Sequence, residues 1–385
     1  MRRVLHTVAS IVAGILLVAP AAALAGPDRR VLTERLQRGL DKLVDTKGGP
    51  PGASALLRRG SRETFLSAGV ADVDSGRPFG PNKRMRIASV SKAFSGAVAL
   101  SLVDDGRLSL DDTIAARLPT LPAAWGAVTL RQALGHTGGI PNYTTDPEFQ
   151  RFFGDHLLDS DVTKQQLVDF VADQGLTFAP GTSYAYSNTD NIIVAMMAEA
   201  ATGKTYEELL AKLVFDPLGL TRTRLPADAK VPGPLIHGYD TIPEVEDLTE
   251  CCSMAFVSAS GGIYSTPREL TTFTSSYVGG KLFGGPARAA QFEFVDGAGS
   301  EPPGPGKNSG GLALFRYETK CGTVFGHTGN FPGYAQFTAA TKNGHRVVTV
   351  SVNRQLAPDA PGKFAPEAFR VLRRDYTRAV CALLS

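Results

Sequence analysis

The spacing of apolar residues changes along the chain, and each spacing predicts an element. Residues 31–46 (VLTERLQRGLDKLVDT) carry apolar side chains at helical intervals, which predicts an amphipathic helix. Residues 53–60 and 63–71 form two short, mainly apolar runs joined by a tight turn, a pattern typical of two strands. Residues 93–108 (AFSGAVALSLVDDGRL) are apolar on nearly all sides, so we expect a buried helix that ends at Gly106.

The middle of the chain is predicted to be helical, and strands return towards its end. The clearest helices have glycine at their C-terminal ends, and the later strands include a hairpin with an Asn343-Gly344 type I′ turn. The expected helices are 163–175, 188–203, 261–278 and 365–385, and the expected strands are 311–318, 322–329 and the two arms of 334–353.

Strands near both ends of the chain with helices between them predict an α+β fold. We expect an antiparallel sheet flanked by the terminal helices, with an all-helical domain inserted in the chain. The sheet part should comprise residues 26–88 and 260–385, and the helical part residues 89–259.

The first 25 residues have the pattern of a secretory signal peptide. A basic start is followed by a short apolar run and by Ala23-Leu24-Ala25, a small-x-small cleavage site. Removal of residues 1–25 also removes Arg2 and Arg3, so the formal charge falls from +3 to +1 (3 − 2). A nearly neutral chain gives no electrostatic reason to bind nucleic acid. We therefore expect a secreted monomer without a membrane anchor.

Export makes disulfides plausible for the four cysteines, Cys251, Cys252, Cys321 and Cys381. Four cysteines allow three pairings, and we favour Cys321 with Cys381 because they lie on a predicted strand and in the terminal helix. Cys251 and Cys252 would then be free thiols or a strained vicinal bridge. The six histidines are not spaced as a metal pair, so we expect no metal and no cofactor.

The first candidate for chemistry is the stretch IASVSKAF, residues 87–94. Positions three apart on a helix are neighbours, so Ser89 and Lys92 can touch. A serine hydroxyl becomes a good nucleophile when a base is within hydrogen-bond reach, and burial can lower the pKa of a lysine until it serves as that base. This S-x-x-K pattern occurs once in the chain.

A second candidate is SYAYSNTDN, residues 183–191, which presents a phenol, a hydroxyl and an amide within three residues. Ser187 or Asn188 can cap the following helix, with Asp190 in its first turn. Caps at the edge of a cleft also expose side chains. Beside a lysine cation, Tyr186 would lose its proton more easily and share the role of base.

Together these pieces resemble the serine penicillin-recognising family, in the branch of class C β-lactamases and D-alanyl-D-alanine carboxypeptidases. Its three ordered elements are S-x-x-K, Y-x-N and K-T-G or H-x-G, which correspond in this chain to Ser89 to Lys92, Tyr186 to Asn188 and His327-Thr328-Gly329. Further similarity runs through LGHTGGIPNY, FAPGTSYAYSN, FDPLGLTRT and GGIYSTPREL, so the resemblance covers nearly all of the chain after the signal.

The resemblance implies a β-lactamase/transpeptidase-like fold and an acyl-enzyme mechanism. Ser89 would attack the substrate carbonyl while Lys92 and Tyr186 move the proton, and Tyr186 would later activate water. The backbone N–H groups of Ser89 and Asn330 would form the oxyanion hole. The remaining residues implied in substrate binding are Asn188, His327, Thr328, Gly329 and Phe256, the last as an aromatic wall.

His327 departs from the lysine found in many relatives. An unperturbed histidine titrates near pH 6–7, so we expect His327→Lys to flatten the pH dependence of KM there. Arg316 could help to hold a substrate carboxylate. We expect a D-alanyl-D-alanine carboxypeptidase acting on peptidoglycan peptides or a β-lactam. The alternatives are a β-lactamase, a D-amino-acid peptidase or an esterase on the same scaffold, or an inactive penicillin- or peptidoglycan-binding protein.

Overall fold

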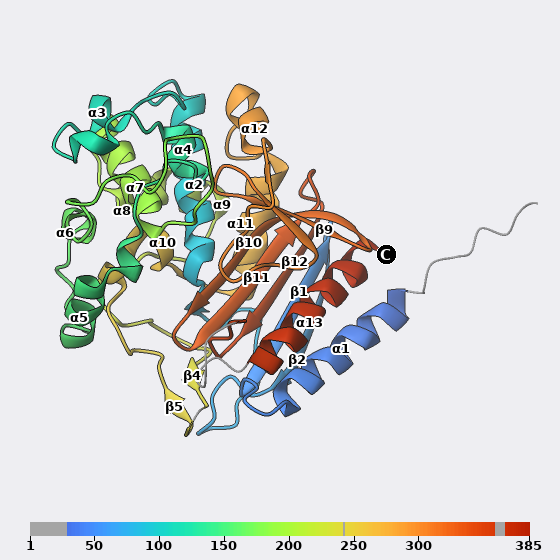
Figure 1. The fold of residues 1–385 in the computed structure, drawn as a ribbon. Coiled ribbons are helices and arrows are strands. Elements are labelled where there is room, and N and C mark those ends of the chain that lie inside the picture. Colours follow the sequence, from blue (N-terminus) through green and yellow to red (C-terminus); the bar gives the residue numbers. More distant parts are fainter. Residues whose placement is uncertain (1–28, 242, 359–365) are drawn as a thin grey trace, which may run out of the picture.

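The computed structural model describes residues 29–241, 243–358 and 366–385. An antiparallel sheet forms the centre of one of its two parts, and helices make up most of the other (Figure 1). Its strands are β1 (Gly52–Arg59), β2 (Arg62–Gly69), β7 (Val295–Asp296), β8 (Lys307–Gly310), β9 (Phe315–Thr319), β10 (Gly322–Phe331), β11 (Tyr334–Ala340) and β12 (Arg346–Val352). Within the described residues they form an eight-stranded sheet in the order β2-β1-β12-β11-β10-β9-β8-β7. The N-terminal hairpin therefore completes the sheet beside the C-terminal strands. The expected signal peptide, residues 1–25, lies outside the described residues.

Two short strand pairs and a set of helices complete the described structure. The pairs are β3 (Met85–Arg86) with β6 (Tyr264–Ser265) and β4 (Tyr239–Asp240) with β5 (Glu246–Asp247). The α-helices are α1 (Arg29–Asp45), α2 (Ser91–Asp104), α3 (Ile114–Arg117), α4 (Leu130–Leu134), α5 (Pro147–Asp155), α6 (Lys164–Asp169), α7 (Asn188–Thr202), α8 (Tyr206–Leu210), α9 (Asp216–Leu218), α10 (Ser258–Gly261), α11 (Pro267–Gly279), α12 (Gly285–Gln291) and α13 (Pro366–Leu384). No helix in the described part of the chain is both long and apolar enough to span a bilayer.

The terminal helices α1 and α13 lie side by side against one face of the sheet (Figure 1). Their apolar residues recur at helical spacing, so each helix buries one stripe of side chains. Gly39 permits the close approach of the two helices, because a Cβ there would overlap the carboxylate of Asp375. Alternate residues of β11, Ala335, Phe337 and Ala339, belong to the same apolar core.

The opposite face of the sheet is covered by α11, which separates it from the helical part (Figure 1). The contact includes hydroxyl pairs: Thr271 and Thr349 are 2.8 Å apart between their Oγ1 atoms, as are Thr274 and Thr338. Because both faces are covered, β11 and β12 are buried along almost their whole lengths. This explains why these strands read as continuous apolar runs.

The predicted α+β fold is confirmed, with several local corrections. The expected helix 163–175 ends at Asp169, and the expected helix 261–278 begins only at Pro267, after β6. The expected strand 311–318 is shorter in the structure, since β9 begins only at Phe315. The hairpin of β11 and β12 is confirmed, but its turn is not type I′, because Gly344 has a positive φ (+70°) and Asn343 does not. Strands β7 and β8 were not predicted, because their short sequences have no clear alternation.

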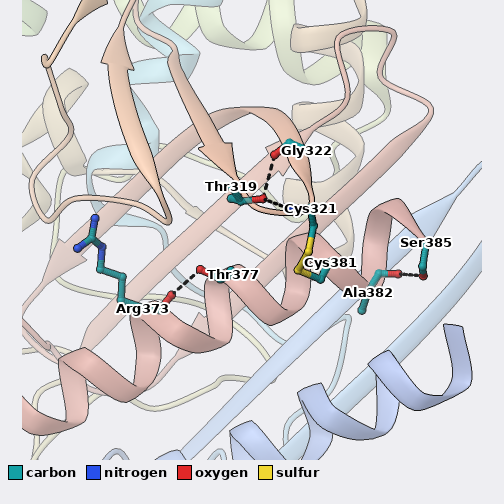
Figure 2. Close-up of a disulfide and its surroundings, with 8 residues drawn as sticks. All are labelled: Thr319, Cys321, Gly322, Arg373, Thr377, Cys381, Ala382 and Ser385. Atoms are coloured by element: carbon teal, nitrogen blue, oxygen red, sulfur yellow. Dashed lines mark hydrogen bonds between the residues drawn. A yellow bond between two sulfur atoms is a disulfide. The ribbon is translucent and has the colours of Figure 1, made fainter. Parts of the chain in front are cut away.

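The expected disulfide between Cys321 and Cys381 is present (Figure 2). It ties the turn before β10 to α13, with a Cα–Cα distance of 5.1 Å and a sequence separation of 60 residues. Cys251 and Cys252 are free thiols, with their Sγ atoms 2.7 Å apart. Because Cys381 lies in the last turn of α13, the disulfide anchors the C-terminal end of this helix to the sheet.

Removal of this disulfide should destabilise the protein without affecting catalysis. For Cys321→Ser/Cys381→Ser we expect the free energy of unfolding to fall by about 2–4 kcal/mol, because the unfolded chain regains the entropy of a long closed loop. Urea unfolding of the oxidised wild type and the double variant measures this loss. The matched control, Cys251→Ser/Cys252→Ser, removes two thiols but no bridge; an equal loss in both variants would contradict the assignment.

Candidate active site

Ser89 lies at the junction between a buried strand pair and the central helix of the helical part. It occupies a single 3-10 turn, residues Ala88–Val90, directly before α2. Ala88 has a φ of +51°, a left-handed conformation that is uncommon for a residue with a Cβ. Strain of this kind is concentrated at functional sites. Ala88 and Val90 are buried, whereas Ser89 keeps partial access to solvent.

Lys92 is fully buried one turn further along, and its ammonium group has three partners. The Nζ atom lies 3.2 Å from Ser89 Oγ, 2.6 Å from Asn188 Oδ1 and 2.7 Å from the carbonyl oxygen of Ser260. Asn188 is the first residue of α7, and its own Nδ2 donates to Thr144 Oγ1 at 2.9 Å. The predicted contact between Ser89 and Lys92 is confirmed, and Asn188 also holds the lysine.

Burial lowers the pKa of Lys92 to about 7, against the opposing effect of the negative charges of Glu301 and Asp190. A substantial fraction of Lys92 is therefore neutral near pH 7 and able to accept a proton from Ser89. Sequence spacing identified this pair. It gave no indication of the Ser260 carbonyl, which lies on α10, far away in the chain.

Tyr186 faces the same pair, with Lys92 Nζ 4.9 Å from its ring centroid. The expectation that a nearby cation lowers its pKa is wrong, because burial raises the pKa of Tyr186 and outweighs the small lowering effect of Ser89. Its hydroxyl has no hydrogen bond of standard geometry with any described residue. Tyr186 is therefore a neutral phenol that can donate a proton, and Lys92, with the lowered pKa, is the candidate base.

A buried histidine–aspartate pair, which was not predicted from the sequence, packs against the ring of Tyr186. His136 Nδ1 lies 2.8 Å from Asp190 Oδ2, and the His136 ring packs on the Tyr186 ring with 4.6 Å between centroids. Burial lowers the pKa of His136 and raises the pKa of Asp190, because it disfavours the charged form of each group. The only hint in the sequence was Asp190 in the first turn of α7.

Strand β10 passes directly beside the nucleophile. Gly329 is required there, since a Cβ would overlap the carbonyl oxygen of Ile87 and lie 3.2 Å from the backbone nitrogen of Ser89. This close approach brings the following residue, Asn330, to the same edge of the site. The oxyanion hole formed by the N–H groups of Ser89 and Asn330 stays a prediction, consistent with this arrangement.

His327 does not behave as expected. It is buried, and burial lowers its pKa to about 3, so it stays neutral across the physiological pH range. Its Nδ1 contacts the carbonyl oxygen of Thr328, and its ring packs edge-on against Phe315. This low pKa argues against a change of KM near pH 6–7 through His327, and the effect of His327→Lys on KM stays a prediction.

Two other residues implied in substrate binding also have internal partners. Thr328 Oγ1 donates to the carbonyl oxygen of Pro302 at 2.7 Å, and Asn330 Oδ1 accepts from the N–H of Leu356 at 3.3 Å. Phe256 cannot form an aromatic wall of an open cleft, because it is fully buried. It packs in a cluster with Phe149, Phe152 and Phe153.

Arg316 does not offer a free positive charge for a substrate carboxylate, and no metal site is found among the described residues. Arg316 pairs with Asp296 at 2.6 Å and with Glu318 at 3.3 Å, so its charge is already balanced. The described residues contain no group of three histidine, cysteine, aspartate or glutamate side chains that could hold a metal ion. The site brings together a candidate nucleophile, a buried candidate base and a neutral phenol.

Residues 32–369 match the family model described as Beta-lactamase. The chain belongs to the beta-lactamase family. The beta-lactamase fold is shared by a family of serine hydrolases, and the match places this chain in that family. The placement of Ser89, Lys92 and Tyr186 agrees with that membership.

Three relatives illustrate where the chain lies within the beta-lactamase family. Penicillin-binding protein 4* of Bacillus subtilis (strain 168) is 26% identical over 283 residues, covering 70% of this chain but 60% of that protein, so the chain spans less than two thirds of this curated relative. The D-stereospecific amidohydrolase from Streptomyces sp. is 28% identical with a TM-score of 0.75, covering 91% and 98% of the two chains. The D-amino acid amidase from Ochrobactrum anthropi SV3 complexed with D-phenylalanine is 25% identical with a TM-score of 0.77, again covering 91% and 98%.

Proposed function

We propose that the protein is an exported, monomeric hydrolase that cleaves amide bonds of small D-amino-acid compounds through an acyl-enzyme on Ser89. The observation that carries this proposal is the contact of Ser89 Oγ with the buried Lys92 Nζ at 3.2 Å, together with a lysine pKa of about 7. A nucleophile beside a base poised near neutrality is what acyl transfer requires, whereas a binding protein needs neither.

In the acylation step, Ser89 Oγ attacks the amide carbon and its proton passes to neutral Lys92. The backbone N–H groups of Ser89 and Asn330 would stabilise the oxyanion, a contribution of about 3–4 kcal/mol per donor in other serine hydrolases. Tyr186 then donates its proton to the leaving nitrogen and recovers one from Lys92. The C–N bond breaks, the amine leaves, and the acyl group remains on Ser89.

In the deacylation step, water attacks the ester carbon and gives its proton to Lys92 through Tyr186. The bond between the carbonyl carbon and Ser89 Oγ breaks, and the serine oxygen regains the proton. The carboxylic acid leaves, and Lys92 and Tyr186 return to their starting states. Asn188 keeps the lysine in reach throughout, since its Oδ1 is 2.6 Å from Nζ.

Two substrate classes fit this chemistry, and the charges near Ser89 favour one of them. A D-alanyl-D-alanine carboxypeptidase must hold a substrate carboxylate, but His327 is neutral and the Thr328 hydroxyl is occupied by Pro302. Simple amides of D-amino acids need no such cation. Similarity to a D-stereospecific amidohydrolase and a D-amino acid amidase supports the same choice. We therefore place D-amino-acid amides first and D-alanyl-D-alanine peptides second.

A panel of substrates tests this proposal. We expect the purified protein to hydrolyse D-phenylalaninamide with a kcat/KM at least about a hundredfold above that for L-phenylalaninamide, in line with its similarity to a D-stereospecific amidohydrolase. Release of ammonia gives the rate. An N-acylated peptide ending in D-Ala-D-Ala and benzylpenicillin are the comparison substrates. Faster hydrolysis of the peptide would select the carboxypeptidase, and faster hydrolysis of penicillin the β-lactamase; either would contradict the preference for D-amino-acid amides.

A further inference from the structure

The loop of residues 299–302 is bound at both ends to the edge of the active site. Tyr184 Oη donates to the carbonyl oxygen of Gly299 at 2.6 Å. Thr328 Oγ1 lies 2.7 Å from Ser300 Oγ and donates to the carbonyl oxygen of Pro302 at 2.7 Å. The loop is therefore fixed against β10 at the residue before Gly329, which itself contacts the backbone of Ser89.

Glu301 lies between these anchors and is exposed to solvent as a residue, while neighbouring atoms shield part of its carboxylate. Among the described residues, no side chain or backbone group forms a hydrogen bond or ion pair with this carboxylate. Its charge nevertheless reaches the site, because it is the strongest of the charges acting on the pKa of Lys92 and it also raises the pKa of Tyr186. Neighbouring atoms remove enough water from Glu301 to raise its own pKa.

An unpaired and partly dehydrated carboxylate favours the arrival of a cation. A charge-assisted hydrogen bond to an ammonium group would replace the lost water, whereas a second carboxylate would be repelled. Lys92 cannot play the part of that cation, because its Nζ is already held by Ser89, Asn188 and Ser260. The partner must come with the substrate.

The loop also occupies the hydroxyl of Thr328, a residue that the family resemblance implies in substrate binding. Thr328 Oγ1 is fully buried and donates its hydrogen to Pro302, so it offers no donor to a ligand. The loop of residues 299–302 thus makes the Thr328 hydroxyl unavailable to an anion and presents the Glu301 carboxylate, which is suited to a cation. Both effects change the charge selectivity of the site in the same direction.

We propose that Glu301 determines substrate specificity by holding the ammonium group of a D-amino-acid amide and repelling substrates with a carboxylate at the same place. This inference rests on the proposed function. It narrows the substrate class to amides with a free amino group, and assigns to Glu301 a role in binding instead of in proton transfer.

The test compares a charged substrate with its neutral counterpart. For Glu301→Gln we expect KM for D-alanine p-nitroanilide to rise about tenfold with kcat changed less than about twofold, because one charge-assisted contact is lost. KM for N-acetyl-D-alanine p-nitroanilide should stay within about twofold, since this substrate has no ammonium group. Glu301→Asp, which keeps the charge, should recover part of the loss. The control Glu367→Gln, on the first turn of α13, should match the wild type for both substrates.

Each outcome of this comparison decides a different point. Equal changes of KM for both substrates, or no change for either, would overturn the role of Glu301 while leaving the proposed function intact. A decrease of KM for the charged substrate in Glu301→Gln would overturn it as well. If the wild type turns over neither D-anilide and neither amide enantiomer, the proposed function fails and the inference fails with it. Thermal unfolding of Glu301→Gln confirms that any loss arises in a folded protein.

Discussion

Ser89→Ala should lower kcat/KM for D-phenylalaninamide by at least about ten-thousandfold, because the acyl-enzyme can no longer form. The fold should persist, since Ser89 is partly exposed and its hydroxyl supports only Lys92 among the hydrogen bonds described. Initial rates of ammonia release and thermal unfolding of the same sample measure the two effects.

Ser91→Ala is the matched control for this substitution. Ser91 is two residues away, and its Oγ accepts the backbone N–H of Ile263 at 3.1 Å, a structural contact away from the Lys92 ammonium. We expect this variant to lose about 1 kcal/mol of stability and to keep most of its activity. If Ser91→Ala loses activity and Ser89→Ala retains it, the nucleophile is Ser91 and the assignment of Ser89 is wrong.

Lys92→Met should lower kcat by about a thousandfold or more, because a general base contributes roughly this much to acyl transfer. The wild-type pH profile should identify the same group. Only the neutral lysine accepts the proton, and the pKa of Lys92 is about 7, so kcat/KM for N-acetyl-D-alanine p-nitroanilide, which has no titrating amine, should rise with pH and level off above this value. Below it, the rate should fall about tenfold for each pH unit.

The control for Lys92 is Lys164→Met, which removes a lysine paired with Glu199 at 3.0 Å in the helical part. This variant should keep both the rate and the acid limb of the wild type. A Lys92→Met enzyme with an unchanged pH profile would show that another group titrates near pH 7. The Tyr186 phenol, whose pKa is raised by burial, should not contribute to this limb.

The candidate nucleophile and base were predictable because their contact depends on short spacing. Ser89 and Lys92 are three residues apart at a helix start, so local geometry predicted their contact. Asn188, the first residue of α7, was identified through the family resemblance instead. The helical pattern of α1 and α13 and the disulfide between β10 and α13 followed from the same kind of local information. Long apolar runs also revealed the strands that are buried on both faces.

Contacts between segments that are distant in the chain could not be predicted from sequence patterns. Glu301 and His136 owe their positions to Thr328 and Asp190, residues that lie far from them in the chain. The expected behaviour of His327 failed for a related reason. Spacing identified its strand but not its depth, and depth sets the direction of a pKa shift.

The central claim is that Ser89 carries the acyl group, and intact-protein mass measures this most directly. The protein would be incubated in parallel with benzylpenicillin and D-phenylalanine methyl ester, quenched in acid, weighed and mapped by proteolysis. The account predicts one acyl group per chain from at least one reagent, on the peptide that contains Ser89, and none in Ser89→Ala. Turnover without any trapped acyl group, or an acyl group that persists in Ser89→Ala, would contradict it.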